Sequence, residues 1–109
     1  MVLSSLEIGK ALADRGRVVF RAQGTCMYPL VRPGEVLHLE SRTVDDVAVG
    51  DIAVCRRPGY LVAHRTIGKG VEEGKPYILT RPDRVQRGGD GPSFDEDVLG
   101  IVASIERKG

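Results

Sequence analysis

Two cysteines and two histidines are the residues of this 109-residue chain best suited to chemistry: Cys26, Cys55, His38 and His64. Cys26 lies in residues 24–29, Gly-Thr-Cys-Met-Tyr-Pro, where the flanking Gly and Pro favour a constrained turn. A thiol exposed on such a turn can act as a nucleophile, with neighbouring backbone N–H groups stabilising an oxyanion. The alternative is that Cys26 is a small buried hydrophobic residue, because free cysteine is among the most buried residue types.

His64 follows the apolar run Leu-Val-Ala and is the candidate base. A neutral imidazole accepts protons near pH 7, which is what activation of a thiol requires. A purely structural histidine is the alternative. We expect Cys55, near the end of an apolar run, to pack in the core. His38 alternates with Leu37 and Leu39, so we expect it to face solvent or the other side of a sheet.

The spacing of these four residues does not favour a metal site or a cofactor. There is no Cys-x-x-Cys pair, and Cys26 and Cys55 lie far apart in the sequence. The glycines at 68–70 and 88–89 lack the strand–loop–helix context of a phosphate-binding loop. Arg56 and Arg57 give local positive charge, which we expect to be solvated rather than to bind nucleic acid.

The composition excludes several classes of protein. The net charge of +1 and the 5% aromatic content give no reason to expect nucleic acid as a partner. No apolar run approaches the ~20 residues of a membrane helix. Charged residues interrupt the N-terminal stretch, so we do not expect it to serve as the apolar core of a signal peptide. We expect a soluble, cytoplasmic protein with reduced thiols; the oligomeric state stays open.

The length predicts one domain, over residues 1–109, with a short helix in residues 1–16 and a β-rich remainder. Ser4 and Glu7 fit a capping box, the apolar stripe comprises Leu6, Ala11 and Leu12, and Gly16 is the expected end of the helix. We expect strands at residues 17–21, 36–40, 52–55, 60–67, 77–80 and 98–105, and the longest loop at residues 81–97.

Two segments share a pattern in which a glycine and an acidic residue lead directly into a strand. They are Gly34-Glu35 and Gly50-Asp51. Glycine allows a backbone conformation that other residues resist, and the acid can accept hydrogen bonds from nearby amides. We therefore interpret Glu35 and Asp51 as residues that fix turns rather than as a catalytic pair.

Five segments occur in a fixed order from about Arg17 to the C-terminus. They are residues 24–35 (Gly-Thr-Cys-Met-Tyr-Pro-Leu, then Arg-Pro-Gly-Glu), 49–54 (Val-Gly-Asp-Ile-Ala-Val), 62–67 (Val-Ala-His-Arg-Thr-Ile), 79–90 (Leu-Thr-Arg-Pro-Asp through Asp) and 98–102 (Val-Leu-Gly-Ile-Val). In this order they resemble the sequence boxes of the signal peptidase I and LexA-type peptidase superfamily. Cysteine stands where the superfamily has its nucleophilic serine.

The resemblance implies a role for particular residues. Cys26 matches the nucleophile and His64 the general base, a position that holds histidine in the endoplasmic-reticulum and archaeal-type signal peptidases. Asp90, or alternatively Asp83, matches the acid that orients the base. The amide N–H of Cys26 is the expected oxyanion donor, with Thr25 and Met27 as further oxyanion or substrate-binding candidates.

The resemblance also implies a fold and a function. The fold is mostly β, a small, coiled, partly open antiparallel barrel with a short N-terminal helix. The function is that of a signal-peptidase-like endopeptidase (a hydrolase) that cleaves an extended peptide segment, with a peptide or protein as its substrate. The alternative is a catalytically inactive relative that binds a peptide or a partner protein.

Overall fold

The predicted N-terminal helix is present as α1 (Ser5–Arg15), and it ends at Gly16 as expected. The structure is a computed structural model that describes residues 5–21, 34–83 and 85–107, with only the backbone described at residues 5, 6, 20 and 21. Gly16 has a φ of 74°, and its N–H donates to the carbonyl of Leu12 at 2.9 Å. Such a left-handed residue closes a helix at little cost only when it is glycine. The expected cap at Ser4 lies outside the described residues.

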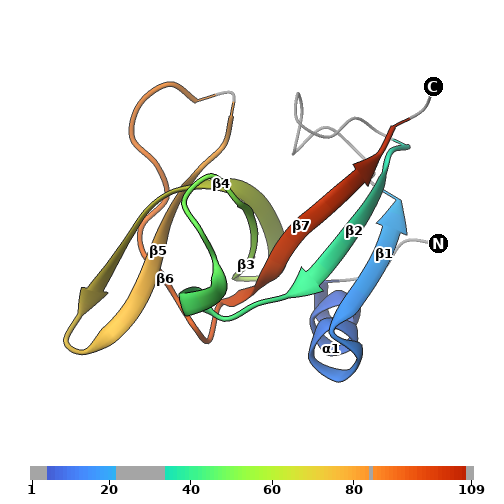
Figure 1. The fold of residues 1–109 in the computed structure, drawn as a ribbon, viewed down its shortest axis with the longest axis horizontal. Coiled ribbons are helices and arrows are strands. Elements are labelled where there is room, and N and C mark those ends of the chain that lie inside the picture. Colours follow the sequence, from blue (N-terminus) through green and yellow to red (C-terminus); the bar gives the residue numbers. More distant parts are fainter. Residues whose placement is uncertain (1–4, 22–33, 84, 108–109) are drawn as a thin grey trace.

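The rest of the described chain is one antiparallel sheet with the strand order β1-β2-β7-β3-β4-β5-β6 (Figure 1). The mostly β class is confirmed. The sheet does not close into a barrel, because β1 and β6 form its two edges and do not pair with each other. Its strands are β1 (Arg17–Arg21), β2 (Val36–Ser41), β3 (Ile52–Arg57), β4 (Tyr60–Glu72), β5 (Lys75–Arg81), β6 (Ser93–Phe94) and β7 (Val98–Glu106).

Three local features were not expected from the sequence. Strand β4 continues beyond residue 67 because a register shift between Thr66 and Gly68 lets the glycine-containing segment pair with β5. The hairpin then turns at Glu73 and Gly74, both with positive φ. A short 3-10 helix, η1 (Val44–Asp46), follows β2, and the expected long loop at 81–97 contains the two-residue strand β6.

The core consists of two clusters of buried apolar side chains, which strand β3 joins. Val54 belongs to the first cluster, with residues of α1, β1 and β2, whereas the adjacent Ala53 and Cys55 belong to the second. This alternation follows from the two-residue period of a strand. The first cluster comprises Ile8, Leu12, Val18, Leu37, Leu39, Val54 and Ala63; the second comprises Val44, Val47, Ala53, Cys55, Ile78 and Val98.

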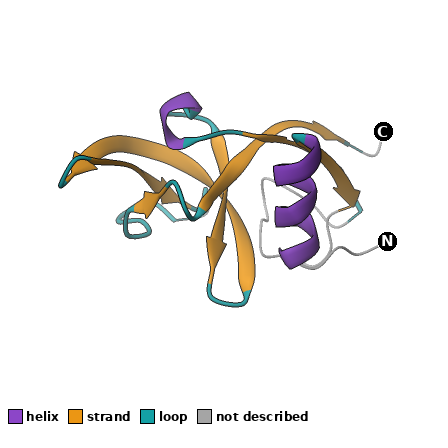
Figure 2. Ribbon diagram, turned by 90° about the horizontal axis from the view of Figure 1, so that it is seen from below, coloured by secondary structure: helices purple, strands orange, loops and turns teal. Residues whose placement is uncertain are grey.

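Helix α1 packs against strands β1, β2 and β7 through Ile8 and Leu12, which are four residues apart and so lie on one helical face. Leu12 was expected in this stripe, and Ile8 was not. Figure 2 shows the helix and the β4–β5 hairpin at opposite ends of the sheet. The expected site residues of β4 and of the loop after β5 thus belong to elements other than the strands on which the helix packs.

The two glycine–acid turns have different structures. Gly50 has a φ of 101°, and the Asp51 carboxylate accepts a hydrogen bond from the Ala48 N–H at 2.9 Å, which confirms its role in the turn. Glu35 is buried, and its two carboxylate oxygens accept from the same nitrogen, Nη1 of Arg107, at 3.0 and 2.9 Å. Glu35 therefore links the start of β2 to the end of β7.

Candidate active site

His64 lies in β4, with 15% of its side chain exposed. Its Nδ1 atom is 2.6 Å from Oδ2 of Asp90, a residue of the loop that follows β5. An ionised carboxylate can only accept hydrogen bonds, so Nδ1 of His64 is the donor. Neutral His64 then carries its proton on Nδ1, and Nε2 is the nitrogen that can accept another proton.

Asp90 is fixed by β5 through both its backbone and its side chain. The Asp90 N–H donates to the Thr80 carbonyl at 2.8 Å, and the Thr80 hydroxyl donates to Oδ2 of Asp90 at 2.7 Å. Gly89 permits this close approach, since a Cβ there would lie 2.8 Å from the Thr80 carbonyl oxygen. Thr80 itself is fully buried, so the carboxylate is anchored to the core.

Arg57, the last residue of β3, contacts the same carboxylate oxygen. Its Nη2 atom is 3.4 Å from Oδ2 of Asp90, while Nη1 donates to the Ser93 hydroxyl at 3.2 Å. Only 20% of the Arg57 side chain is exposed. The expectation that both arginines at the end of β3 are solvated is therefore wrong for Arg57, whereas Arg56 is exposed.

These contacts determine the charge of Asp90. Burial raises the pKa of the Asp90 carboxyl. The hydrogen bonds from His64 and Thr80, together with the positive charge of Arg57, lower this pKa by more than burial raises it. The net pKa lies below the ordinary value of 3.8. Asp90 is consequently ionised at neutral pH and able to orient and stabilise a charged imidazole.

Asp83, the alternative partner for His64, makes an ion pair elsewhere. Its two carboxylate oxygens accept hydrogen bonds from Nε and Nη2 of Arg65, each at 2.9 Å. This bidentate pair lowers the pKa of the Asp83 carboxyl. Arg65 also donates to the Gly50 carbonyl at 2.9 Å, so the pair ties the loop after β5 to the turn before β3.

Cys55 is fully buried in β3, as expected for a core residue. Burial raises the pKa of its thiol, and the nearby charge of Arg57 offsets only part of that effect. A protonated, inaccessible thiol is a poor nucleophile. Cys26, Thr25 and Met27 lie outside the described residues, so their expected roles stay predictions.

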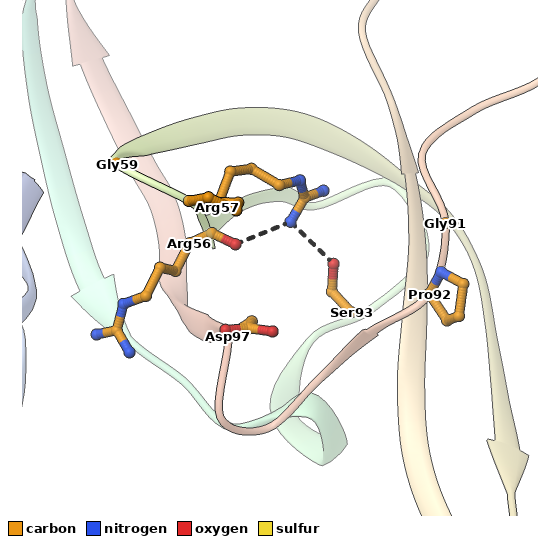
Figure 3. Close-up of a pocket in the computed structure, with 8 residues that line it drawn as sticks. Arg56, Arg57, Gly59, Gly91, Pro92, Ser93 and Asp97 are labelled. Carbon is orange, nitrogen blue, oxygen red and sulfur yellow. Dashed lines mark hydrogen bonds between the residues drawn. The ribbon is translucent and has the colours of Figure 1, made fainter.

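A pocket of about 510 Å³ opens between the β3–β4 turn and residues that follow Asp90 in the chain. Figure 3 shows Arg57 pointing across it toward Ser93, while Arg56 extends in the opposite direction. The lining residues are Arg56, Arg57, Pro58, Gly59, Gly91, Pro92, Ser93 and Asp97. Arg57 thus connects the pocket with the His64–Asp90 pair.

Sequence reasoning missed Thr80 and Arg57. Thr80 falls within the segment that resembles a superfamily box, but nothing in its local sequence indicates a bond to Asp90. His38, the other histidine, is hydrogen-bonded through Nε2 to Glu106 at 2.8 Å. Among residues 5–21, 34–83 and 85–107, no three His, Cys, Asp or Glu side chains gather in a way that could hold a metal ion.

Comparison with models of known protein families found no match, and no curated protein sequence matches the chain either. In the part of the chain that the structure describes, no helix has the length and apolar character needed to cross a bilayer.

Proposed function

We propose that the protein is a hydrolase in which Cys26, His64 and Asp90 form a catalytic triad. The observation that carries this proposal is the 2.6 Å hydrogen bond between Nδ1 of His64 and Oδ2 of Asp90. A base held by an ionised acid is the part of such a triad that requires the most specific geometry. The order of the sequence segments supports a signal-peptidase-like endopeptidase in particular.

The proposed reaction is acyl transfer from an extended peptide. Nε2 of His64 takes the thiol proton as Sγ of Cys26 attacks the scissile carbonyl carbon, and the backbone N–H of Cys26 stabilises the oxyanion. The tetrahedral intermediate collapses to a thioester as the leaving amine takes the proton from His64. Water then loses a proton to His64 as it attacks the thioester carbon. The C–S bond of the resulting intermediate breaks, the carboxylic acid is released, and the Cys26 thiolate takes the proton back from His64.

Asp90 contributes to this reaction without touching the substrate. It holds the imidazole in the tautomer that leaves Nε2 free to accept a proton, and it stabilises the imidazolium that forms. Thr80 and the Asp90 backbone N–H fix the carboxylate to β5. The pair is therefore organised before any substrate binds, which favours catalysis.

The second candidate is a catalytically inactive relative that binds an extended peptide. The open sheet favours it, because β1 is an edge strand with its outward side unpaired among the described strands. A binder needs neither an activated thiol nor a peptide-cleaving geometry. The two candidates therefore differ in the reactivity of Cys26.

The decisive experiment is alkylation of the native protein with iodoacetamide across pH, read at each cysteine by mass spectrometry. We expect Cys26 to react faster than the buried Cys55, and to be thiolate well below the ~8.5 of a free cysteine. His64→Ala should slow that reaction, and Asp90→Asn should slow it less. His38→Ala is the matched control, because it removes the other histidine.

Cleavage is tested by incubating the protein with a library of peptides and identifying the products. Wild type and Cys55→Ala should generate the same new termini, whereas Cys26→Ala should generate none. If the Cys26 profiles of wild type and His64→Ala coincide, and peptides are bound but left intact, the triad is wrong and the binding function is correct.

A further inference from the structure

Oδ2 of Asp90 lies close to three donors that come from different strands. They are Nδ1 of His64 on β4 at 2.6 Å, the Thr80 hydroxyl on β5 at 2.7 Å and Nη2 of Arg57 on β3 at 3.4 Å. A single carboxylate oxygen has two lone pairs, so the three compete for it. The two shortest contacts take these lone pairs, and the Arg57 contact is left long.

The guanidinium of Arg57 has little freedom to move away. Nη1 donates to the Ser93 hydroxyl at 3.2 Å and to the carbonyl of Arg56 at 3.1 Å (Figure 3). Nη2 is buried and has no hydrogen bond of acceptable geometry. A permanent positive charge is therefore held against Asp90, partly shielded from water, where charge interactions are stronger than at the surface.

We propose that Arg57 is a positioning residue that limits how strongly Asp90 can stabilise a positive charge on His64. The inference rests on the proposed function, because it describes how the candidate base is kept ready to accept a proton. Protonation of His64 places a second cation on the carboxylate that already faces Arg57. The positive charge of Arg57 opposes that step and so favours the neutral, proton-accepting form of His64.

The other charges near His64 do not duplicate this effect. Asp83, in the same loop as Asp90, also attracts a positive charge on His64, but it is largely neutralised by Arg65. The arginines that act on the two carboxylates are Arg57 on Asp90, and Arg65 and Arg81 on Asp83. Arg57 is thus the arginine that contacts the same carboxylate as His64 does, so its positive charge weakens the stabilisation that Asp90 gives to a protonated His64.

The test follows the ring protons of both histidines by NMR as pH is varied. Arg57→Gln should move the midpoint of the His64 titration to higher pH, by a few tenths of a unit to about one unit. Arg56→Gln is the matched control: it removes the same charge from the adjacent, exposed position, and it should leave the His64 midpoint nearly unchanged. His38, which pairs with Glu106, serves as an internal reference in every variant.

Two further variants separate charge from packing. Arg57→Lys keeps the charge and should keep the wild-type midpoint. Ser93→Ala removes one anchor of the guanidinium and should move the midpoint in the same direction as Arg57→Gln, by less. This variant also tests the proposal if Arg57→Gln does not fold.

The proposal is overturned if the His64 midpoints of Arg57→Gln and Arg56→Gln agree, or if Arg57→Lys shifts the midpoint as far as Arg57→Gln. The titration needs no substrate. Failure of peptide cleavage with the expected NMR shifts would reject the proposed peptidase alone, whereas cleavage without those shifts would reject only the role of Arg57.

Discussion

Asp83 and Asp90 occupy one loop, yet they have different partners and different consequences for the site. Asp90 accepts from His64 and Thr80, which ties it to two strands of the sheet. Asp83 accepts both hydrogen bonds of the Arg65 guanidinium. The two carboxylates therefore have different roles. Asp90 orients the candidate base, and Asp83 fixes the loop in which both acids lie.

The Asp83–Arg65 pair predicts how stability depends on acid. Because folding lowers the pKa of Asp83, the pair contributes stability above the unfolded value of 3.8 and loses it as pH falls through the folded pKa. Asp83→Asn should lower the free energy of unfolding by about 1 kcal/mol or less at pH 6, since the pair is partly exposed. Below pH 5, the stability of this variant should fall less steeply with pH than that of wild type. Urea unfolding measured from pH 2.5 to 6 checks this.

Asp45→Asn is the control for that measurement, because the Asp45 carboxylate makes no ion pair within the described part of the chain. It should leave the acid limb of the stability curve unchanged. Equal slopes for Asp83→Asn and wild type would show that the ion pair contributes nothing to acid sensitivity.

At the scale of elements, β7 is the strand that holds the two halves of the sheet together, since it pairs with β2 on one side and with β3 on the other. Gly100 pairs with Ser41 on β2 and with Val54 on β3. A Cβ at Gly100 would overlap the backbone carbonyl of Glu40 and lie 3.1 Å from the Cα of Ser41. The glycine is therefore required by the close approach of two backbones.

Gly100→Ala should consequently destabilise the protein by about 1–3 kcal/mol, the usual cost of forcing extra volume into a packed site. Gly91→Ala is the matched control, because a Cβ at that position meets nothing within 4 Å. It should change the free energy of unfolding by less than about 0.5 kcal/mol. Chemical unfolding followed by circular dichroism measures both, and equal stability of the two variants would contradict the steric argument.

The whole molecule depends on the connection between its two core clusters. Strand β3 contributes Val54 to one and the adjacent Ala53 and Cys55 to the other, so neither cluster can lose its packing without disturbing the shared strand. The His64–Asp90 hydrogen bond joins β4 to the loop after β5. Helix α1 packs on the first cluster, at the opposite end of the sheet from the β4–β5 hairpin (Figure 2). We expect the described fold to unfold as one unit.

Leu12→Ala in the first cluster and Ile78→Ala in the second should each lower the free energy of unfolding by about 2–5 kcal/mol. Both variants should still unfold in one transition. Lys10→Ala, on the exposed side of α1, should leave the free energy of unfolding nearly unchanged. Calorimetry checks the expectation through equal calorimetric and van't Hoff enthalpies. Two separated transitions, one shifted by each core variant, would show that the clusters fold independently.

The sequence by itself determined the features that depend on neighbouring residues. Gly16 ends the helix because glycine adopts a left-handed conformation, and Cys55, near the end of an apolar run, packs in the core. The resemblance favoured Asp90 as the partner of His64 and kept Asp83 as the alternative. Local pattern could not choose between two acids in one loop.

Only the tertiary structure decided which acid lies against His64, and that Arg57 lies there too. The pairing requires Thr80 on β5 to hold Asp90, and it requires Gly89 to let the loop approach that strand. It also requires the β3–β4 hairpin to bring Arg57 to Asp90, more than thirty residues further along the chain. An arginine that looks solvated in the sequence becomes part of a charge network because strands distant in sequence meet in space.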